Sequence, residues 1–153
     1  MPESGPAHSA TIMAFDFGEK RIGVAIGETL LGEARALATV AESANDRRFA
    51  AIGKLIAEWQ PARLVVGLPR HLDDAEHEFA GRCERFARQL EGRYHLPVEM
   101  ADERYSSALA ESALGDKRKN KARLDAEAAA VILQAWFNQR HAIPTTAHVT
   151  LGH

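Results

Sequence analysis

Three parts of the chain carry carboxylates beside apolar segments, where acidic residues are uncommon. Asp16 ends one apolar run, Asp102 and Glu103 follow a strand-like run, and Asp125 begins a third apolar segment. A carboxylate taken out of water is costly unless a positive or hydrogen-bonding group meets it. Carboxylates that converge also repel one another unless a hard cation lies between them, and oxygen ligands suit Mg²⁺ or Mn²⁺. If these acids meet in the fold, they indicate metal-assisted phosphodiester cleavage.

Each acid also has an ordinary structural explanation that the sequence leaves open. Aspartate is common at turns and helix caps, which accounts for Asp16 and Asp125 taken one at a time. Asp102 and Glu103 can pair with nearby arginines. The spacing alone does not show that the three positions meet, although their shared context favours a common site.

The elements that position these acids follow from the apolar periodicity of the chain. Strands are predicted at Thr11–Phe17, Ile22–Glu28, Glu33–Ala41, Leu64–Leu68 and Pro97–Ala101. Helices are predicted around Phe49–Trp59, Phe79–Leu90 and Leu124–Gln139. This order predicts an α/β fold, a mixed five-stranded sheet with helices on both faces, with Leu64–Leu68 beside the first strand. It is the element order of the ribonuclease-H-like fold.

The last predicted helix places Asp125 on its sheet-facing side. Positions 125, 129, 132 and 136 share one helical face, so the carboxylate continues an apolar stripe of Ala129, Ile132 and Trp136. We therefore expect Asp125 to point toward the sheet rather than into solvent. Cys83 and both tryptophans also lie on apolar faces and are predicted to pack in the core.

Length and composition limit the class of protein. The chain has 153 residues, a formal net charge of −2 and one cysteine, which suits one domain in a reducing compartment such as the cytoplasm. No apolar run reaches the ~18 residues of a membrane span. Residues 1–10 are predicted as a disordered leader, 11–141 as a single domain and 142–153 as a flexible tail. A monomer or a weak homodimer is expected.

Basic residues gather directly ahead of Asp125 in an otherwise net-negative chain. The dense run contains Lys117, Arg118, Lys119 and Lys121. It is a candidate contact for nucleic-acid phosphates, or alternatively a solvated loop. No aromatic residues interleave with it, so contact with the nucleic-acid backbone is the better expectation. Lys20, Arg21 and Arg104 flank the acids and are further candidates to hold phosphate or to offset the carboxylates.

Four motifs together resemble a known family. The segments AFDFGEKRIGVAIGE, LVVGLP, ADERYSS and RLDAEAAAVILQAWF are similar to the YqgF-type Holliday junction resolvase-like family, also described as pre-16S ribosomal RNA nucleases. The resemblance runs from about Thr11 to Arg140. It implies a ribonuclease-H-like fold, a cytoplasmic bacterial protein and a metal-dependent nuclease.

The resemblance also implies roles for particular residues. Asp16, Glu103 and Asp125 would be the catalytic residues and the ligands of Mg²⁺ or Mn²⁺, with Asp102 as a further candidate ligand. Adjacent strand residues face opposite sides, so both acids can be ligands only if the strand has ended before them, and the resemblance assigns the role to Glu103. Glu19 departs from the family, which usually has a small hydroxyl residue there. The segment after LVVGLP also departs from the family pattern, and we place no catalytic residue on it.

The function expected on this basis is a metal-dependent nuclease on structured nucleic acid, processing the 5′ end of precursor 16S ribosomal RNA in ribosome biogenesis. One alternative is a Holliday junction resolvase acting on branched DNA, which needs two coordinated cuts and hence a symmetric dimer. A non-catalytic nucleic-acid-binding module would not need the acids. A phosphotransferase of the sugar-kinase type normally needs two such domains.

Overall fold

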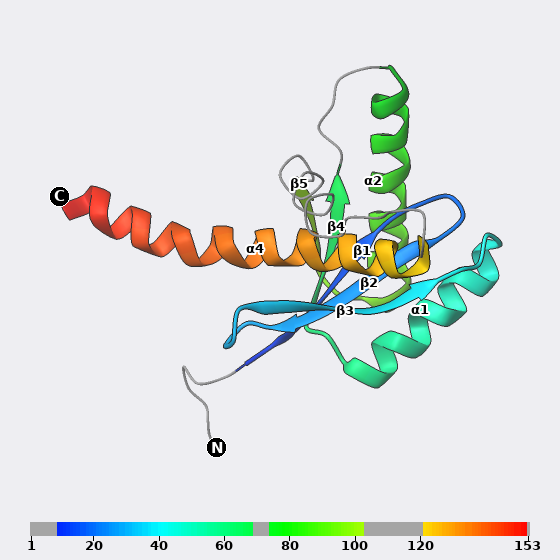
Figure 1. Ribbon diagram of the computed structural model, residues 1–153, viewed down its shortest axis with the longest axis horizontal. Coiled ribbons are helices and arrows are strands. Elements are labelled where there is room, and N and C mark those ends of the chain that lie inside the picture. Colours follow the sequence, from blue (N-terminus) through cyan, green and yellow to red (C-terminus); the bar gives the residue numbers. More distant parts are fainter. Residues whose placement is uncertain (1–8, 69–73, 103–120, 153) are drawn as a thin grey trace.

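The computed structural model describes residues 9–68, 74–102 and 121–152, and for residues 74–77, 102, 121–124 and 141–152 it describes the backbone alone. The chain forms three strands, then a helix, and then two strands that alternate with two further helices (Figure 1). The strands are β1 (Thr11–Asp16), β2 (Ile22–Glu28), β3 (Glu33–Val40), β4 (Arg63–Leu68) and β5 (Val98–Asp102). The helices are α1 (Asn45–Trp59), α2 (Asp74–Tyr94) and α4 (Lys121–Gly152).

The five strands form one mixed sheet in the order β3-β2-β1-β4-β5. The pairs β1–β2 and β2–β3 are antiparallel, whereas β4 pairs in parallel with β1 and with β5. The predicted sheet and the place of β4 beside β1 are therefore confirmed. The carboxyl ends of the parallel strands β1, β4 and β5 point to the same end of the sheet. The acids with which β1 and β5 end lie there.

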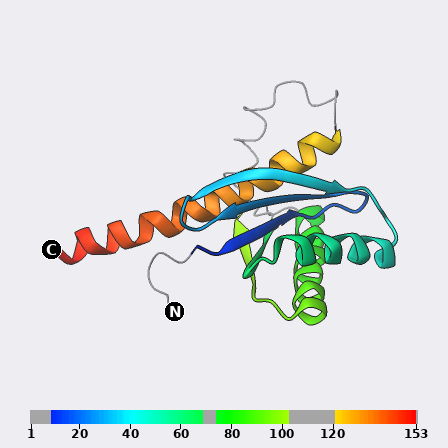
Figure 2. The same ribbon diagram turned by 90° about the horizontal axis from the view of Figure 1, so that it is seen from below.

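Helices α1 and α2 cover one face of the sheet, as Figure 2 shows. The core on this face joins β1, β2 and β4 to both helices and includes Met13 and Phe15 together with the α2 stripe. Cys83 is fully buried there, as its place on the stripe predicts. The rings of Phe15 and Phe86 meet edge to face with centroids 5.8 Å apart, which locks α2 against the central strand.

Helix α4 covers the opposite face and packs on β1, β2 and β3 (Figure 2). Its buried residues include Ala129, Ile132 and Trp136, the three apolar residues of the predicted stripe. The expectation of helices on both faces is thereby confirmed. Among the described residues, no helix combines the length and the apolar character that crossing a membrane requires.

Two local predictions differ from the structure. Strand β1 ends at Asp16 rather than at Phe17, because Phe17 turns into the core between the sheet and α2. Helix α4 continues to Gly152, so the backbone of residues 142–152 is helical where we expect a tail. The apolar periodicity stops near Gln139, and Pro144 is unfavourable inside a helix, so composition alone predicts an earlier end. The division of the chain into leader, domain and tail stays a prediction, and residues 1–8 lie outside the described residues.

Glu99 connects the edge strand β5 to helix α4 through side-chain contacts. Its carboxylate accepts a hydrogen bond of 2.9 Å from the indole N–H of Trp136. The other oxygen pairs with Arg63 of β4 at 2.6 Å and with Arg140 of α4 at 2.9 Å. The two ion pairs are partly exposed and so contribute little, whereas the indole of Trp136 is buried and needs its acceptor.

We predict that Glu99→Ala lowers the free energy of unfolding by roughly 1–3 kcal/mol, because it leaves the buried Trp136 N–H without its acceptor. Glu99→Gln keeps an amide oxygen for the indole and loses only the partly exposed ion pairs, so its cost is expected to be clearly smaller. Denaturant unfolding of both variants measures the difference. Equal losses would show that the ion pairs, and not the indole hydrogen bond, dominate.

Candidate active site

Asp16 projects from the end of β1 toward the α4 side of the sheet. Side chains alternate along a strand, and Ile12 and Ala14 of β1 belong to the core cluster beneath α4. Asp16 continues this series, whereas Phe17 packs with the core of the other face. The last residue of β1 and the residue that follows it therefore serve opposite sides of the sheet.

Gly23 of β2 brings the first turn of α4 to Asp16. The two residues stand directly opposite each other in the antiparallel β1–β2 pair, so their Cβ positions lie on one face, about 5 Å apart. A Cβ built on Gly23 would overlap the carbonyl oxygen of Asp125 and lie 2.9 Å from the amide nitrogen of Ala126. The first turn of α4 thus rests on the backbone of β2, and the backbone of Asp125 packs on Gly23, the cross-strand partner of Asp16.

Arg21 pairs with one of these acids. Its Nε donates to Oδ2 of Asp125 at 2.6 Å, and the two side chains are 32% and 26% exposed. Arg21 precedes β2, so the ion pair joins the turn after β1 to the start of the last helix. The sequence prediction that Arg21 offsets a carboxylate agrees with this contact, whereas a role in phosphate binding is not tested by it.

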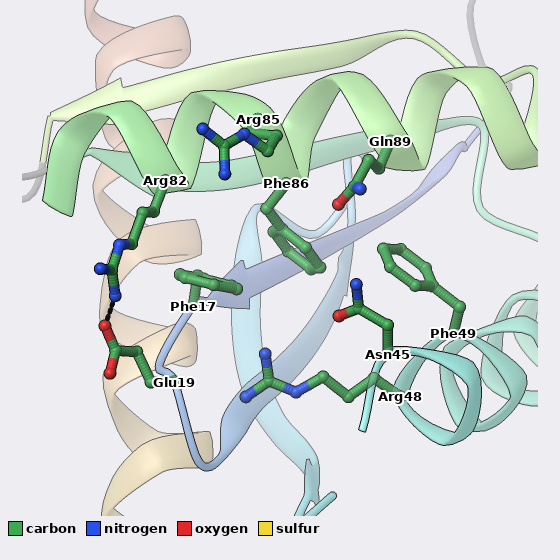
Figure 3. A pocket seen from close by; sticks show the side chains of 9 residues that line it. All are labelled: Phe17, Glu19, Asn45, Arg48, Phe49, Arg82, Arg85, Phe86 and Gln89. Atoms are coloured by element: carbon green, nitrogen blue, oxygen red, sulfur yellow. Dashed lines mark ion pairs between the residues drawn. The ribbon is translucent and has the colours of Figure 1, made fainter. Parts of the chain in front are cut away.

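The turn after β1 is also held by α1 and α2. Arg48 of α1 donates through a terminal guanidinium nitrogen to the carbonyl oxygen of Gly18 at 2.5 Å. Glu19 forms an ion pair with Arg82 of α2 (Figure 3). The residue at which the chain departs from the family pattern thus anchors the turn to α2. With Arg21 bound to α4, the five-residue turn 17–21 contacts each of the three described helices, α1, α2 and α4.

The remaining predicted site residues are described only in part. Asp102 ends β5 opposite Leu68 of β4, and its side chain is outside the description. Lys20 is exposed in the turn after β1, and Lys121 begins α4 with its backbone alone described. Glu103, Arg104, Lys117, Arg118 and Lys119 lie outside the described residues. Within the part of the chain that the structure covers, no three acidic, histidine or cysteine residues group as a metal site.

Sequence reasoning missed a pocket beside the turn after β1. It encloses about 330 Å³ between α1 and α2, and Figure 3 shows its lining side chains. These are Phe17, Glu19, Asn45, Arg48, Phe49, Arg82, Arg85, Phe86 and Gln89. A signal was present, because positions 82, 85 and 89 recur at the spacing of one polar helix face.

The sheet order, with helices on both faces, is that of the ribonuclease-H-like fold. A family model described as "RuvX: Holliday junction resolvase" matches residues 10–139. The chain therefore belongs to the RuvX family of Holliday junction resolvases.

Similar proteins support the same assignment. A protein of Methylobacillus flagellatus named "Putative pre-16S rRNA nuclease" is 54% identical over 142 residues, which cover 90% of this chain and 97% of that protein. A protein of Chromobacterium violaceum with the same name is 54% identical over 132 residues, covering 83% of this chain and 96% of that one. The enzyme class is thus a hydrolase of phosphodiester bonds.

A solved structure shows the same fold. RuvC of T. thermophilus in complex with a Holliday junction substrate superposes with a TM-score of 0.56, covering 86% of this chain and 96% of that one. The sequence identity is 16%, so the likeness concerns the fold alone.

We predict that Gly23→Ala displaces the first turn of α4, because the new methyl group would overlap the Asp125 carbonyl. The free energy of unfolding should fall by roughly 1–3 kcal/mol, the usual cost of overpacking. If Asp125 is catalytic, as the family resemblance implies, nuclease activity should fall more than tenfold, since small misplacements of catalytic groups are costly. Gly81→Ala is the matched control, because a Cβ there meets nothing within 4 Å. It should stabilise the protein slightly, as alanine favours helix. An unchanged Gly23→Ala variant would contradict the close approach of α4.

Proposed function

We propose that this protein is a metal-dependent nuclease of structured nucleic acid and that it processes the 5′ end of precursor 16S ribosomal RNA in the cytoplasm. The observation that carries the proposal is the packing of the Asp125 backbone on Gly23, the cross-strand partner of Asp16. The relatives named as pre-16S rRNA nucleases support the choice of RNA. The absence of a membrane-spanning helix among the described residues is compatible with the proposed compartment.

The two converging acids fit a hard divalent cation. Both offer carboxylate oxygens, which are the donors that Mg²⁺ and Mn²⁺ prefer. When bound, such a cation supplies positive charge at the scissile phosphate and an acidified water. We propose Asp16, Asp125 and Glu103 as its ligands, with Asp102 as the further candidate. Glu103 rests on the family resemblance, because it lies outside the described residues.

Arg21 has a defined task in this arrangement. With its guanidinium 2.6 Å from Oδ2 of Asp125, it neutralises one carboxylate and leaves the second oxygen of Asp125 available. It also stands next to Lys20, which is exposed and can contact a phosphate of the substrate. We propose that Arg21 positions Asp125, while Lys20, Arg104 and the basic run ahead of α4 bind the nucleic-acid backbone.

Branched DNA is the second candidate substrate. The family model is described as a Holliday junction resolvase, and a RuvC structure shares the fold. Resolution of a junction requires two coordinated cuts and therefore a symmetric dimer. We propose a monomer or weak homodimer, which suits RNA processing better than junction resolution.

We predict that Asp16→Asn abolishes cleavage of precursor ribosomal RNA in Mg²⁺ or Mn²⁺ and leaves the fold intact, because asparagine keeps the shape and removes the charge. The measurement is single-turnover cleavage of precursor RNA, a four-way DNA junction and a plain single strand by purified protein. Asp46→Asn is the matched control, since Asp46 is an exposed acid in the first turn of α1. Wild-type activity in a folded Asp16→Asn variant would show that Asp16 is not a catalytic residue. Preferential cleavage of the junction would favour the resolvase instead.

We predict that neutralising Lys117, Arg118 and Lys119 together weakens RNA binding at all sequences and leaves turnover at saturating RNA largely unchanged. Each lost phosphate contact reduces the slope of log K against log salt concentration by about 0.7, so the loss of three contacts reduces this slope by about 2. Affinity measured at several salt concentrations tests this. The control neutralises Arg47, Lys54 and Arg88, which are exposed on α1 and α2. Equal slopes in both triple variants would make the run a solvated loop.

A further inference from the structure

The pocket between α1 and α2 lies at the same edge of the sheet as the acids but on the other side. Phe17, which lines it, directly follows Asp16 in the chain. Asp16 faces α4 and Phe17 faces α2. The proposed acidic site and the pocket therefore lie on opposite sides of the sheet at two consecutive residues of the chain. A strand of nucleic acid that passes over the carboxyl end of β1 therefore meets both.

Arg48 places a buried positive charge at the pocket. Its residue surface is only 5% exposed. Its Nε donates to the carbonyl oxygen of Glu42 at 2.6 Å, a terminal nitrogen donates to that of Gly18, and its guanidinium lies 5.4 Å from the centre of the Phe17 ring. These partners are neutral carbonyl groups and a ring face. Burial lowers the pKa of Arg48 by desolvation, although an arginine stays protonated. A charge so placed favours the approach of an anion.

Two arginines of α2 add to this charge. Arg82 pairs with Glu19, whereas Arg85 is exposed and forms no ion pair with another residue that the structure describes. Three guanidinium groups thus line the pocket together with one carboxylate. The local charge is positive although the chain is net negative. Guanidinium groups bind phosphate with paired, directed hydrogen bonds.

The rest of the lining suits the base and sugar of a nucleotide. The rings of Phe17 and Phe86 form an apolar floor, with centroids 4.8 Å apart. The amide groups of Asn45 and Gln89 point into the same space from α1 and α2 (Figure 3). Amides offer both a donor and an acceptor, as the edge of a base requires. The volume of about 330 Å³ is in the range of small-ligand pockets and excludes a base pair within a duplex.

We propose that this pocket binds one unpaired nucleotide of the substrate strand next to the phosphate that is cut. Arg85 and Arg82 hold its phosphate, while the amides of Asn45 and Gln89 meet its base above the aromatic floor. The site selects nucleic acid with an unpaired segment beside a duplex. The identity of the bound strand rests on the proposed function, whereas the pocket itself does not.

The test measures binding without cleavage. Fluorescence anisotropy in EDTA compares a labelled RNA hairpin that carries an unpaired tail with the same hairpin cut blunt. Arg85→Gln removes the exposed pocket arginine. Arg88→Gln is the matched control, because it removes the same charge from an exposed position of the same helix outside the pocket. Arg48 is left in place, since it holds the turn through the Gly18 carbonyl.

We expect wild-type protein to bind the tailed hairpin more tightly than the blunt one. Arg85→Gln should weaken binding of the tailed hairpin roughly five- to tenfold and leave binding of the blunt hairpin unaffected. For the tailed hairpin, the slope of log K against log salt concentration should fall by about 0.7. Arg88→Gln should retain the preference for the tail. Glu19→Gln should tighten binding of the tailed hairpin roughly threefold, because it frees Arg82 and removes the one pocket carboxylate.

Equal effects of Arg85→Gln and Arg88→Gln, or no preference of the wild-type protein for the tail, would overturn the proposal. Displacement of the tailed hairpin by adenosine monophosphate at a similar concentration would also overturn it, because the pocket would then be a site for a free nucleotide. Failure of the wild-type protein to cleave in Mg²⁺ would reject the proposed function and leave the binding result standing. Equal thermal unfolding midpoints of the two arginine variants exclude a folding defect.

Discussion

The close approach of helix α4 to strand β2 is the contact on which the rest of the structure depends. Gly23, Ala25 and Gly27 face α4, so this side of β2 presents little more than backbone. A Cβ at Gly27 would lie 2.6 Å from the Phe137 ring, and one at Gly23 would overlap the Asp125 carbonyl. The helix therefore rests on the strand itself, and this contact decides how far Asp125 stands from Asp16.

The turn after β1 couples the two sides of the sheet. It reaches α4 through Arg21, α1 through Arg48 and α2 through Glu19. Because the three described helices hold one short turn, the end of β1, the start of α4 and the pocket are tied to one another. The proposed cleavage site would need preorganisation of this kind, since charged groups act best when they do not have to move.

The local apolar periodicity of the sequence was sufficient to predict the architecture and the position of one residue of the candidate site. Alternating and helical patterns located all five strands and the faces of three helices, because burial imposes those periods on any sequence. The same reasoning placed Asp125 on the sheet-facing stripe, and the structure pairs it there with Arg21. The apolar stripe that begins at Phe49 did not show the start of α1, which follows the N-cap Ala44, a residue that is unfavourable at that position and makes no side-chain cap. Tertiary packing overrides such local preferences.

By itself, the sequence determined the order of the elements along the chain, the place of β4 beside β1, the helices on both faces and the ends of elements at which carboxylates stand. Only the tertiary structure decided which of these groups meet. Arg21 and Asp125 are 104 residues apart, and no local pattern relates them. Gly23 and Gly27 of β2 are required because α4 packs directly on them. Arg82 and Arg85 line a pocket because the fold places α2 beside α1. Periodicity reports which side of an element is buried, whereas contacts between distant segments depend on how the buried sides fit together.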